Sequence, residues 1–291
     1  MPVFITGGTG YVGASVVREL RRRTHVVRAL ARSEAAAEKL RALGAEPVRG
    51  DLRDHDVLRR EASAADAVLH CAFEYSNENV ALERAALETL IEATRPGRAF
   101  VYTSGVWVYG SRYDAVVAED APLAPLGIVA WRPAHEELVL ASDGRLRAIV
   151  IRPGVVYGDG GGIPGSMVAA AAKGELRVVG DGANRWPTVR HDALAELYGA
   201  VVDQRIARGV YNAQRGAAVP YIEVAHAASR AAGGDGRVEH VALEVARQQM
   251  GPFADALACD LQVDSGRAAR ELGWEPHRPT LLEELANTAV V

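Results

Sequence analysis

Eight residues near the start of the chain form a glycine-rich motif of the kind that binds phosphate groups. The motif Thr6-Gly7-Gly8-Thr9-Gly10-Tyr11-Val12-Gly13 follows the apolar run Val3-Phe4-Ile5 and precedes a helix-like stretch from Tyr11 to Leu20. Glycines permit a tight turn and a close backbone approach, and the free N–H groups of a helix N-terminus attract an anion. A strand, a glycine turn and a helix in this order predict a dinucleotide site. The alternative is a structural turn without a ligand. The predicted contacts of this motif are Gly7, Gly10, Tyr11, Val12 and Gly13.

The end of the second predicted strand, Val26 to Leu30, indicates which dinucleotide binds. Enzymes that use NAD usually place Asp or Glu there to bond the ribose 2′-hydroxyl. Here the strand ends in Leu30-Ala31-Arg32-Ser33, and an arginine suits the 2′-phosphate of NADP because its fork bonds two oxygens while carrying a permanent charge. We therefore expect NADP, with Arg32 as its contact. NAD is the alternative, with Arg32 in solvent and Glu34 on the ribose.

Composition and charge exclude several classes of function. The net charge is −4, which leaves no footprint for nucleic acid, and no apolar stretch reaches the roughly 20 residues of a membrane span. Cys71 and Cys259 suggest neither a disulfide framework nor a metal site, and His135-Glu136-Glu137 lacks the second histidine of a zinc helix. A motif so close to residue 1 leaves no room for a signal peptide, so we expect a cytoplasmic enzyme without a metal.

Strands and helices alternate through the first half of the chain, which predicts an α/β fold with a doubly wound parallel sheet of the Rossmann type. After Arg152 the alternation loosens, and residues 158–165 read as a glycine-rich loop. We expect residues 1–155, completed by about 190–212, to form the dinucleotide-binding core. Residues 156–189 and 213–291 would form a smaller C-terminal substrate lobe. Ligands bind at the carboxyl ends of the strands in such sheets.

An ordered series of further motifs resembles a known family. The series comprises Gly50-Asp-Leu-Arg-Asp54, His70-Cys-Ala72, Thr103-Ser-Gly105, Arg152-Pro-Gly-Val-Val-Tyr-Gly158, Gly180-Asp-Gly182, Val210-Tyr-Asn212 and Glu271-Leu-Gly-Trp-Glu-Pro276. Together with the first glycine motif, it resembles the extended or atypical short-chain dehydrogenases/reductases of the NAD(P)-dependent epimerase/dehydratase group. The resemblance covers essentially the whole chain and is not specific to a substrate.

The resemblance implies roles for residues at the matching positions. Asp51 and Leu52 would contact the adenine, although Asp51 is equally suited to cap the helix that follows. His70, Cys71 and Ala72 would line the cofactor ribose. Ser104 would bond the substrate oxygen. The positions that would pack near the nicotinamide amide are Pro153, Gly154 and Val155.

The chain departs from this family at the acid/base pair. The family normally carries Tyr-x-x-x-Lys on the helix after the fifth strand, with both side chains on one face. Here Ile128 and Arg132 stand at those positions, and no tyrosine lies between Tyr113 and Tyr157. Arg132 can bond a ribose hydroxyl but cannot carry a proton near neutral pH. The alternative proton donors are Tyr109 and Tyr157, for which packing or a local hydrogen bond is the competing interpretation. His135, one turn past Trp131, is expected to face solvent.

A second group of residues consists of candidate substrate contacts. Trp131 is suited to form an apolar wall or to anchor its helix to the sheet. An arginine beside a tryptophan is suited to an anionic or planar group, or to a purely local contact. The candidates are Trp107, Trp131, Tyr157, Arg185 and Trp186.

These residues predict an NADP-dependent oxidoreductase of small-molecule metabolism that reduces a carbonyl or oxidises an alcohol. Ser104, Tyr109 and Arg132 would form its non-standard catalytic site. The missing Tyr/Lys pair keeps two alternatives open: a non-redox isomerase, epimerase or cyclase on the same scaffold, and a cofactor-sensing protein without turnover. We expect a small-molecule substrate, with no nucleic acid or membrane partner. The resemblance adds a homodimer through the helices that flank the fifth strand.

Overall fold

A seven-stranded parallel sheet forms the centre of the computed structural model, which describes residues 1–73, 77–113 and 115–288. The spatial order of its strands is β12-β7-β5-β4-β1-β2-β3, and every neighbouring pair is parallel. This is the doubly wound Rossmann arrangement that the alternating sequence predicted. The strands are β1 (Pro2–Thr6), β2 (Val26–Ala31), β3 (Glu46–Arg49), β4 (Ala67–His70), β5 (Ala99–Thr103), β7 (Arg147–Pro153) and β12 (Gly209–Ala213).

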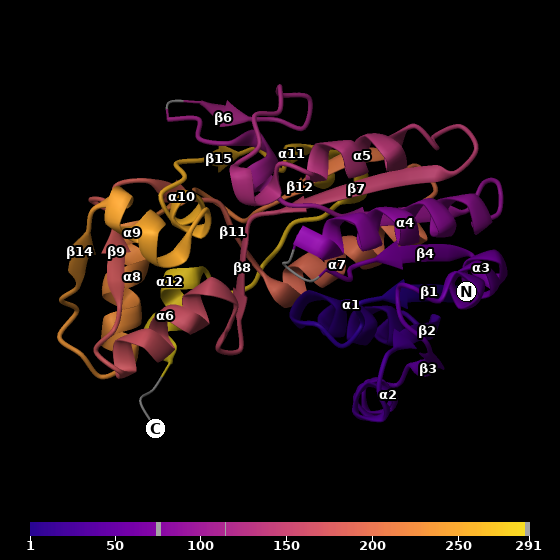
Figure 1. Ribbon diagram of the computed structural model, residues 1–291, viewed down its shortest axis with the longest axis horizontal. Coiled ribbons are helices and arrows are strands. Elements are labelled where there is room, and N and C mark those ends of the chain that lie inside the picture. The colour runs from indigo at the N-terminus through magenta and orange to yellow at the C-terminus, as the bar shows by residue number, and fades with distance from the viewer. Residues whose placement is uncertain (74–76, 114, 289–291) are drawn as a thin grey trace.

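Helices cover both faces of the sheet, as Figure 1 shows. The first face packs against α1 (Tyr11–Arg22), α2 (Glu34–Ala42), α7 (His191–Asp203) and α11 (Gly266–Leu272). The second packs against α3 (His55–Ala64), α4 (Asn77–Ala93) and α5 (Arg132–Leu140). Because successive strand residues point to opposite faces, Tyr102 of β5 joins the α4–α5 side, whereas Thr103 bonds the Tyr198 hydroxyl of α7 at 2.6 Å.

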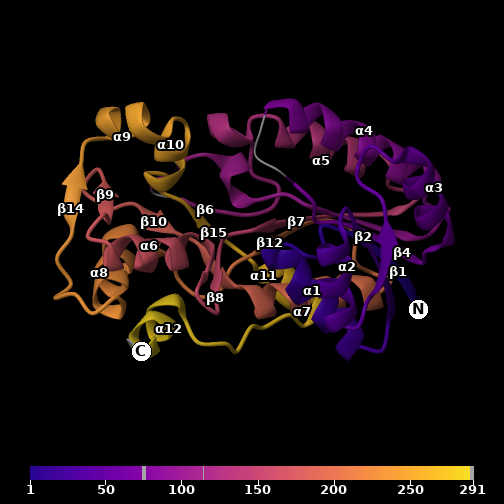
Figure 2. The same cartoon turned by 60° about the horizontal axis from the view of Figure 1, so that its bottom comes forward.

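A second lobe is built from the later part of the chain and has its own apolar core. It lies on the left in Figure 1, beyond the ends of the sheet strands, and Figure 2 shows α12 at its lower edge. Its strands are β8 (Val155–Gly158), β9 (Arg177–Val179), β10 (Arg185–Trp186), β11 (Thr188–Arg190), β13 (Val219–Pro220) and β14 (Glu239–Val241). Its helices are α6 (Gly162–Ala172), α8 (Tyr221–Ala231), α9 (Leu243–Met250), α10 (Phe253–Leu257) and α12 (Leu281–Asn287).

Helix α6 corrects the prediction of a loop over residues 158–165. It begins at Gly162, because the alanine-rich run that follows favours a helix and Met167 packs into the core of the second lobe. Pro164 lies in its first turn, where a missing N–H costs no hydrogen bond. Helix α7 begins at His191, with Arg190 at its N-cap.

Short elements complete the fold between the two lobes. Strand β6 (Val116–Val117) pairs in parallel with β15 (Gln262–Val263), and single 3-10 turns occupy Val106–Tyr109 (η1) and Gly127–Val129 (η2). Across the described ranges of the chain, no helix is both long and apolar enough to cross a bilayer.

Candidate functional site

A cleft of about 250 Å³ lies at the carboxyl ends of β1 to β4. This is the edge of a parallel sheet at which ligands bind. Seven of the predicted cofactor contacts line it: Gly7, Gly10, Arg32, Asp51, Leu52, Cys71 and Ala72. The sequence reasoning missed eight other lining residues: Thr9, Leu30, Ala36, Gly50, Arg53, Phe73, Leu82 and Glu83.

The glycine turn is so tight that it leaves no room for side chains at Gly7 and Gly13. Gly7 has φ +75°, and a Cβ there would lie 2.5 Å from the main-chain nitrogen of Ala72. A Cβ on Gly13 would lie 2.8 Å from the carbonyl carbon of Gly7. Gly10 donates its N–H to the carbonyl of Gly7 at 2.9 Å, which closes the turn directly before α1. The bare backbone at the start of a helix fits the pyrophosphate of a dinucleotide.

The tip of β2 presents positive charge to the cleft. Arg32 is exposed and lines it, and Arg53 from the segment after β3 lines it as well. The competing ribose contact, Glu34, is instead bonded to Arg41 at 2.8 Å on the solvent side of α2. Ser33 accepts a hydrogen bond from the N–H of Ala36 and so starts α2. The composition of this end of the cleft therefore favours an anion over a ribose hydroxyl.

Asp51 contacts its own loop rather than capping a helix. Its carboxylate accepts a hydrogen bond from the N–H of Arg53 at 2.6 Å, and its N–H donates to the carboxylate of Asp54 at 2.8 Å. The residue at the start of α3 is Asp54. Asp51 thus lines the cleft from a rigid turn, and its contact with adenine stays a prediction.

Ser104 and Arg132 lie together at the end of β5. The N–H of Ser104 donates to the Ile151 carbonyl at 2.8 Å, while its buried hydroxyl has no hydrogen-bond partner in the described part of the chain. Arg132 donates to the carbonyl of Thr103 at 2.8 Å. The Arg132 guanidinium also lies 4.5 Å from the ring of Trp131, which stacks on Phe73 at 4.5 Å. A buried hydroxyl without a partner is suited to bond an incoming ligand oxygen.

Tyr109 and Tyr157 both make buried hydrogen bonds, which favours the interpretation of packing or a local hydrogen bond, while proton donation by either stays a prediction. Tyr109 is fully buried, donates to Asn212 at 2.8 Å and accepts from Arg152 at 2.6 Å. Burial raises its pKa above the usual range. Tyr157 is 1% exposed and donates to the Pro279 carbonyl, and burial raises its pKa to about 12.

Two predicted substrate contacts are also occupied by structural interactions. Arg185 bonds the carboxylate of Asp260 at 2.7 and 2.9 Å and donates to the Tyr113 carbonyl. Trp186 is buried, stacks on Tyr221 at 4.4 Å and donates its indole N–H to the main chain. Both residues hold the second lobe together, and their contact with a substrate stays a prediction.

Trp107 and Trp131 remain candidates for apolar walls. Each is half-buried; Trp107 meets Phe253 of α10 edge-on at 6.4 Å. Gly154 packs closely on the Pro187 segment, to which Val155 donates a hydrogen bond at 2.7 Å. The predicted contact of residues 153–155 with the nicotinamide amide stays a prediction.

His70 and His135 lie inside the protein. His70 is 1% exposed, and its ring faces the hydroxyl of Thr6 at 2.9 Å instead of the cleft. His135, which we placed in solvent from the sequence, is 2% exposed and packs against Trp131 at 5.0 Å.

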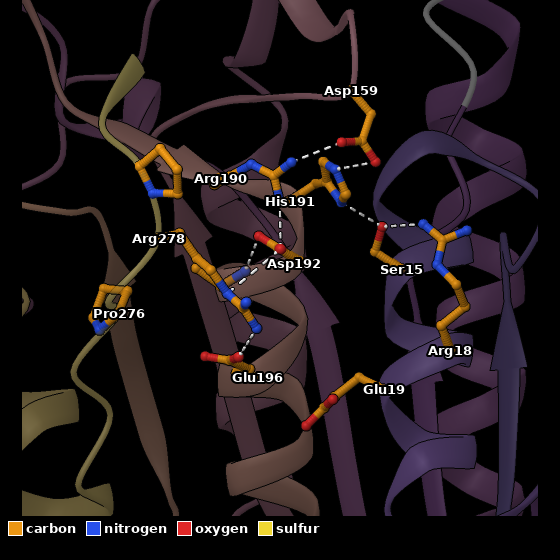
Figure 3. A network of polar contacts seen from close by, with 12 residues as sticks. Ser15, Arg18, Glu19, Asp159, Arg190, His191, Asp192, Glu196, Pro276 and Arg278 are labelled. Carbon is orange, nitrogen blue, oxygen red and sulfur yellow. Dashed lines mark hydrogen bonds and ion pairs between the residues drawn. The ribbon is translucent and has the colours of Figure 1, made fainter. Parts of the chain in front are cut away.

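A polar network joins α1 to the second lobe, as Figure 3 shows. The hydroxyl of Ser15 lies 2.8 Å from Nδ1 of His191, whose Nε2 lies 3.1 Å from the carboxylate of Asp159. Arg190 donates to the same carboxylate at 2.7 Å. Tyr11 is turned toward this lobe too, because its hydroxyl donates at 2.7 Å to the carbonyl at the end of β8. Its side chain therefore lies away from the cleft, as does the half-buried Val12.

Comparisons with known proteins agree with this geometry. A sequence model of the NAD dependent epimerase/dehydratase family matches residues 3–213. The uncharacterized protein C2A9.02 of Schizosaccharomyces pombe is 30% identical over 295 residues, which cover 99% of each chain. A 2-alkyl-3-oxoalkanoate reductase of Stenotrophomonas maltophilia is 30% identical over 216 residues, covering 67% of this chain and 63% of its own.

A solved structure shares the fold across its whole length. The human epimerase family protein SDR39U1 with NADPH has a TM-score of 0.82 at 22% identity, covering 99% of both chains. This likeness shows the fold, while the family match and the reductase relative show an enzyme of oxidoreductase or epimerase type. On the match over residues 3–213, the chain belongs to the NAD dependent epimerase/dehydratase family.

Proposed function

We propose that the protein is an NADP-dependent oxidoreductase of small-molecule metabolism that reduces a carbonyl or oxidises an alcohol. The observation that carries this proposal is the pair of arginines, Arg32 and Arg53, at the β2 end of the cleft, where Glu34 is engaged elsewhere. A guanidinium bonds a phosphate through two N–H groups. The similarity to a relative described as a 2-alkyl-3-oxoalkanoate reductase supports the redox reaction.

Each part of the site would have a separate task in this reaction. The glycine turn and the start of α1 would hold the pyrophosphate, and Asp51 and Leu52 the adenine. The bound cofactor supplies or accepts the hydride. Ser104 would donate a hydrogen bond from its hydroxyl to the substrate oxygen, because that hydroxyl is buried and has no other partner in the described residues. Arg132 would supply positive charge near the developing oxyanion.

The remaining walls favour a substrate with apolar surface. Trp107 with Phe253, and Trp131 with Phe73, form two aromatic pairs near the ends of β5 and β7. Arg185, the cation that we considered for an anionic substrate, is paired with Asp260. We also infer a cytoplasmic homodimer that associates through α4 and α5. Light scattering on the purified protein measures this state, and a monomeric mass would contradict it.

The proposal is tested by cofactor titration. We expect NADPH to bind more tightly than NADH, and Arg32→Ala to weaken NADPH binding without changing NADH binding. A hydrogen bond to a charged group contributes about 1.5–3 kcal/mol, so the dissociation constant for NADPH should rise about 10- to 150-fold. Arg59→Ala is the matched control, since Arg59 pairs with Asp56 on α3 and does not line the cleft.

Two results would refute parts of the proposal. Equal affinity for NADPH and NADH in the wild-type protein would remove the assignment of NADP. Reduction of a panel of ketones and aldehydes, followed by absorbance of the reduced cofactor, tests the redox reaction. Tight cofactor binding without turnover on any of them would favour the non-redox isomerase or the cofactor sensor.

A further inference from the structure

Three ionisable side chains meet in the interior beside the cofactor cleft. Glu83 of α4, His70 at the end of β4 and His135 of α5 are each no more than 2% exposed. His70 Nε2 lies 3.6 Å from one oxygen of Glu83, and His135 Nδ1 lies 3.7 Å from the other. We call these three residues the Glu83 cluster.

The hydrogen bonds of the Glu83 cluster are incomplete. Tyr102 donates to one Glu83 oxygen at 3.2 Å, and Thr6 bonds the far nitrogen of His70 at 2.9 Å. Glu83 Oε2 and the two ring nitrogens nearest this carboxylate, His70 Nε2 and His135 Nδ1, have no hydrogen-bond partner in the described ranges. Buried polar atoms are normally paired, so these three exceptions need an explanation. A proton held by the carboxylate or by an imidazole would make one of the missing hydrogen bonds once the two groups approach each other.

The position of the Glu83 cluster gives this proton a use. Glu83 belongs to the wall of the cleft, together with Ala72 and Phe73. His135 lies one helical turn after Arg132 and packs on the ring of Trp131, which itself stacks on Phe73. The cluster thus lies beside the start of α5, where Arg132 stands at the position of the family's usual lysine.

We propose that the Glu83 cluster holds the proton that is consumed when this enzyme reduces a carbonyl, in place of the missing tyrosine. This inference rests on the proposed redox function. A bound reduced nicotinamide would supply the hydride that the carbonyl carbon accepts and would itself be oxidised, while the electron pair of the C=O π bond would move to oxygen. The oxygen would form its O–H bond with the proton that leaves the cluster. The cluster would then take a new proton from solvent.

The electrostatic surroundings suit a group that releases its proton. Burial lowers the pKa of His135 below its usual range, although the Glu83 carboxylate opposes this shift. The lowered pKa favours transfer of a proton from His135 to an oxyanion, while the nearby Glu83 carboxylate opposes its loss to solvent. The other titratable or charged groups that face the cluster are Tyr102, Arg132, Glu136 and Arg84.

The test compares Glu83→Gln with the control Glu61→Gln. Glu61 is a second buried glutamate, on α3, and it pairs with Arg28 of β2. Glutamine keeps the size of the side chain but cannot take the proton. We expect kcat for carbonyl reduction to fall with rising pH in the wild type and in the control. In Glu83→Gln we expect kcat near neutral pH to fall about 100-fold and this pH dependence to disappear, with the Kd for NADPH unchanged.

A second variant and a second measurement keep the test decisive. His135→Asn should shift the same pH dependence if Glu83→Gln does not fold. Histidine ring nitrogen shifts measured by NMR, without substrate, should show a lower pKa of His135 in Glu83→Gln than in the wild type, because the carboxylate that raises this pKa has been removed. A wild-type pH profile in Glu83→Gln would overturn the proposal. An unchanged His135 pKa in Glu83→Gln would overturn it too, even if no carbonyl substrate turns over and the redox function itself fails.

Discussion

Replacing Gly13 by alanine adds one methyl group to the glycine turn at the start of α1. The new Cβ would overlap the carbonyl oxygen of Gly7, and it would lie 2.8 Å from the carbonyl carbon of Gly7 and 3.1 Å from the Cα of Gly8. Carbon atoms in contact prefer about 3.5 Å or more, so the carbon contact alone requires the turn to open by roughly 0.7 Å, and the oxygen contact requires more. These neighbours are all main-chain atoms and cannot rotate away. Overpacking of this kind costs about 1–3 kcal/mol, which lowers Tm by about 2–12 °C.

The same displacement moves the N–H groups that would hold the pyrophosphate. Loss of one hydrogen bond to a charged group costs about 1.5–3 kcal/mol, so the Kd for NADPH should rise about 10- to 150-fold. Fluorescence titration measures the Kd, and scanning calorimetry measures Tm. Gly127→Ala is the control, because a Cβ there meets no atom within 4 Å. A Gly13→Ala protein with the wild-type Kd would refute the placement of the pyrophosphate.

Three further predictions concern buried charges and thiols. Glu136→Gln removes the carboxylate that pairs with the buried Arg152. Urea denaturation should then show a loss of about 3–5 kcal/mol in the free energy of unfolding, and a loss below about 1 kcal/mol would contradict the buried pair. Burial raises the pKa of Cys71 and of Cys259 to about 11, so iodoacetamide at pH 8 should label both only after unfolding, and rapid labelling of the native protein would contradict this. Burial acts to raise the pKa of Asp260, but hydrogen bonds from Arg185 outweigh this and lower it below 3.8. The stability from this pair is therefore present at neutral pH and is lost as pH falls below 3.8 through the lowered pKa, and acid titrations of Asp260→Asn should lack that loss.

The order of the elements in the Rossmann core follows from local signals in the sequence. Apolar runs such as Val3-Phe4-Ile5 are buried on both faces of a parallel sheet, and a glycine turn and a capping serine mark where α1 and α2 begin. The cleft residues were predictable for the same reason, because loops at the ends of parallel strands meet at one edge. Helix α6 was missed because the glycines at its start hid a run of alanines that forms a helix only by packing on the second lobe.

The partners of individual side chains were not predictable, because they depend on residues far away in the chain. Tyr109 could be a proton donor by type, but Arg152 and Asn212 bind its hydroxyl from β7 and β12. Trp186 is occupied by a stacking partner 35 residues later, Tyr221. His135 was placed in solvent because its helix was read without knowing which face packs on the sheet. Periodicity indicates that a helix has a buried face, but it does not show which polar groups are drawn into that face.

The network between α1 and the second lobe also bears on how such enzymes can be recombined. Tyr11 and Ser15 both belong to α1. The Tyr11 side chain nevertheless bonds Gly158, and the Ser15 side chain bonds His191. A chimera that joins this N-terminal part to the later part of a relative would leave the pair Ser15 and His191 mismatched. We expect functional exchange of the second lobe only when positions 11 and 15 are transferred with it, although they lie almost 150 residues before the junction.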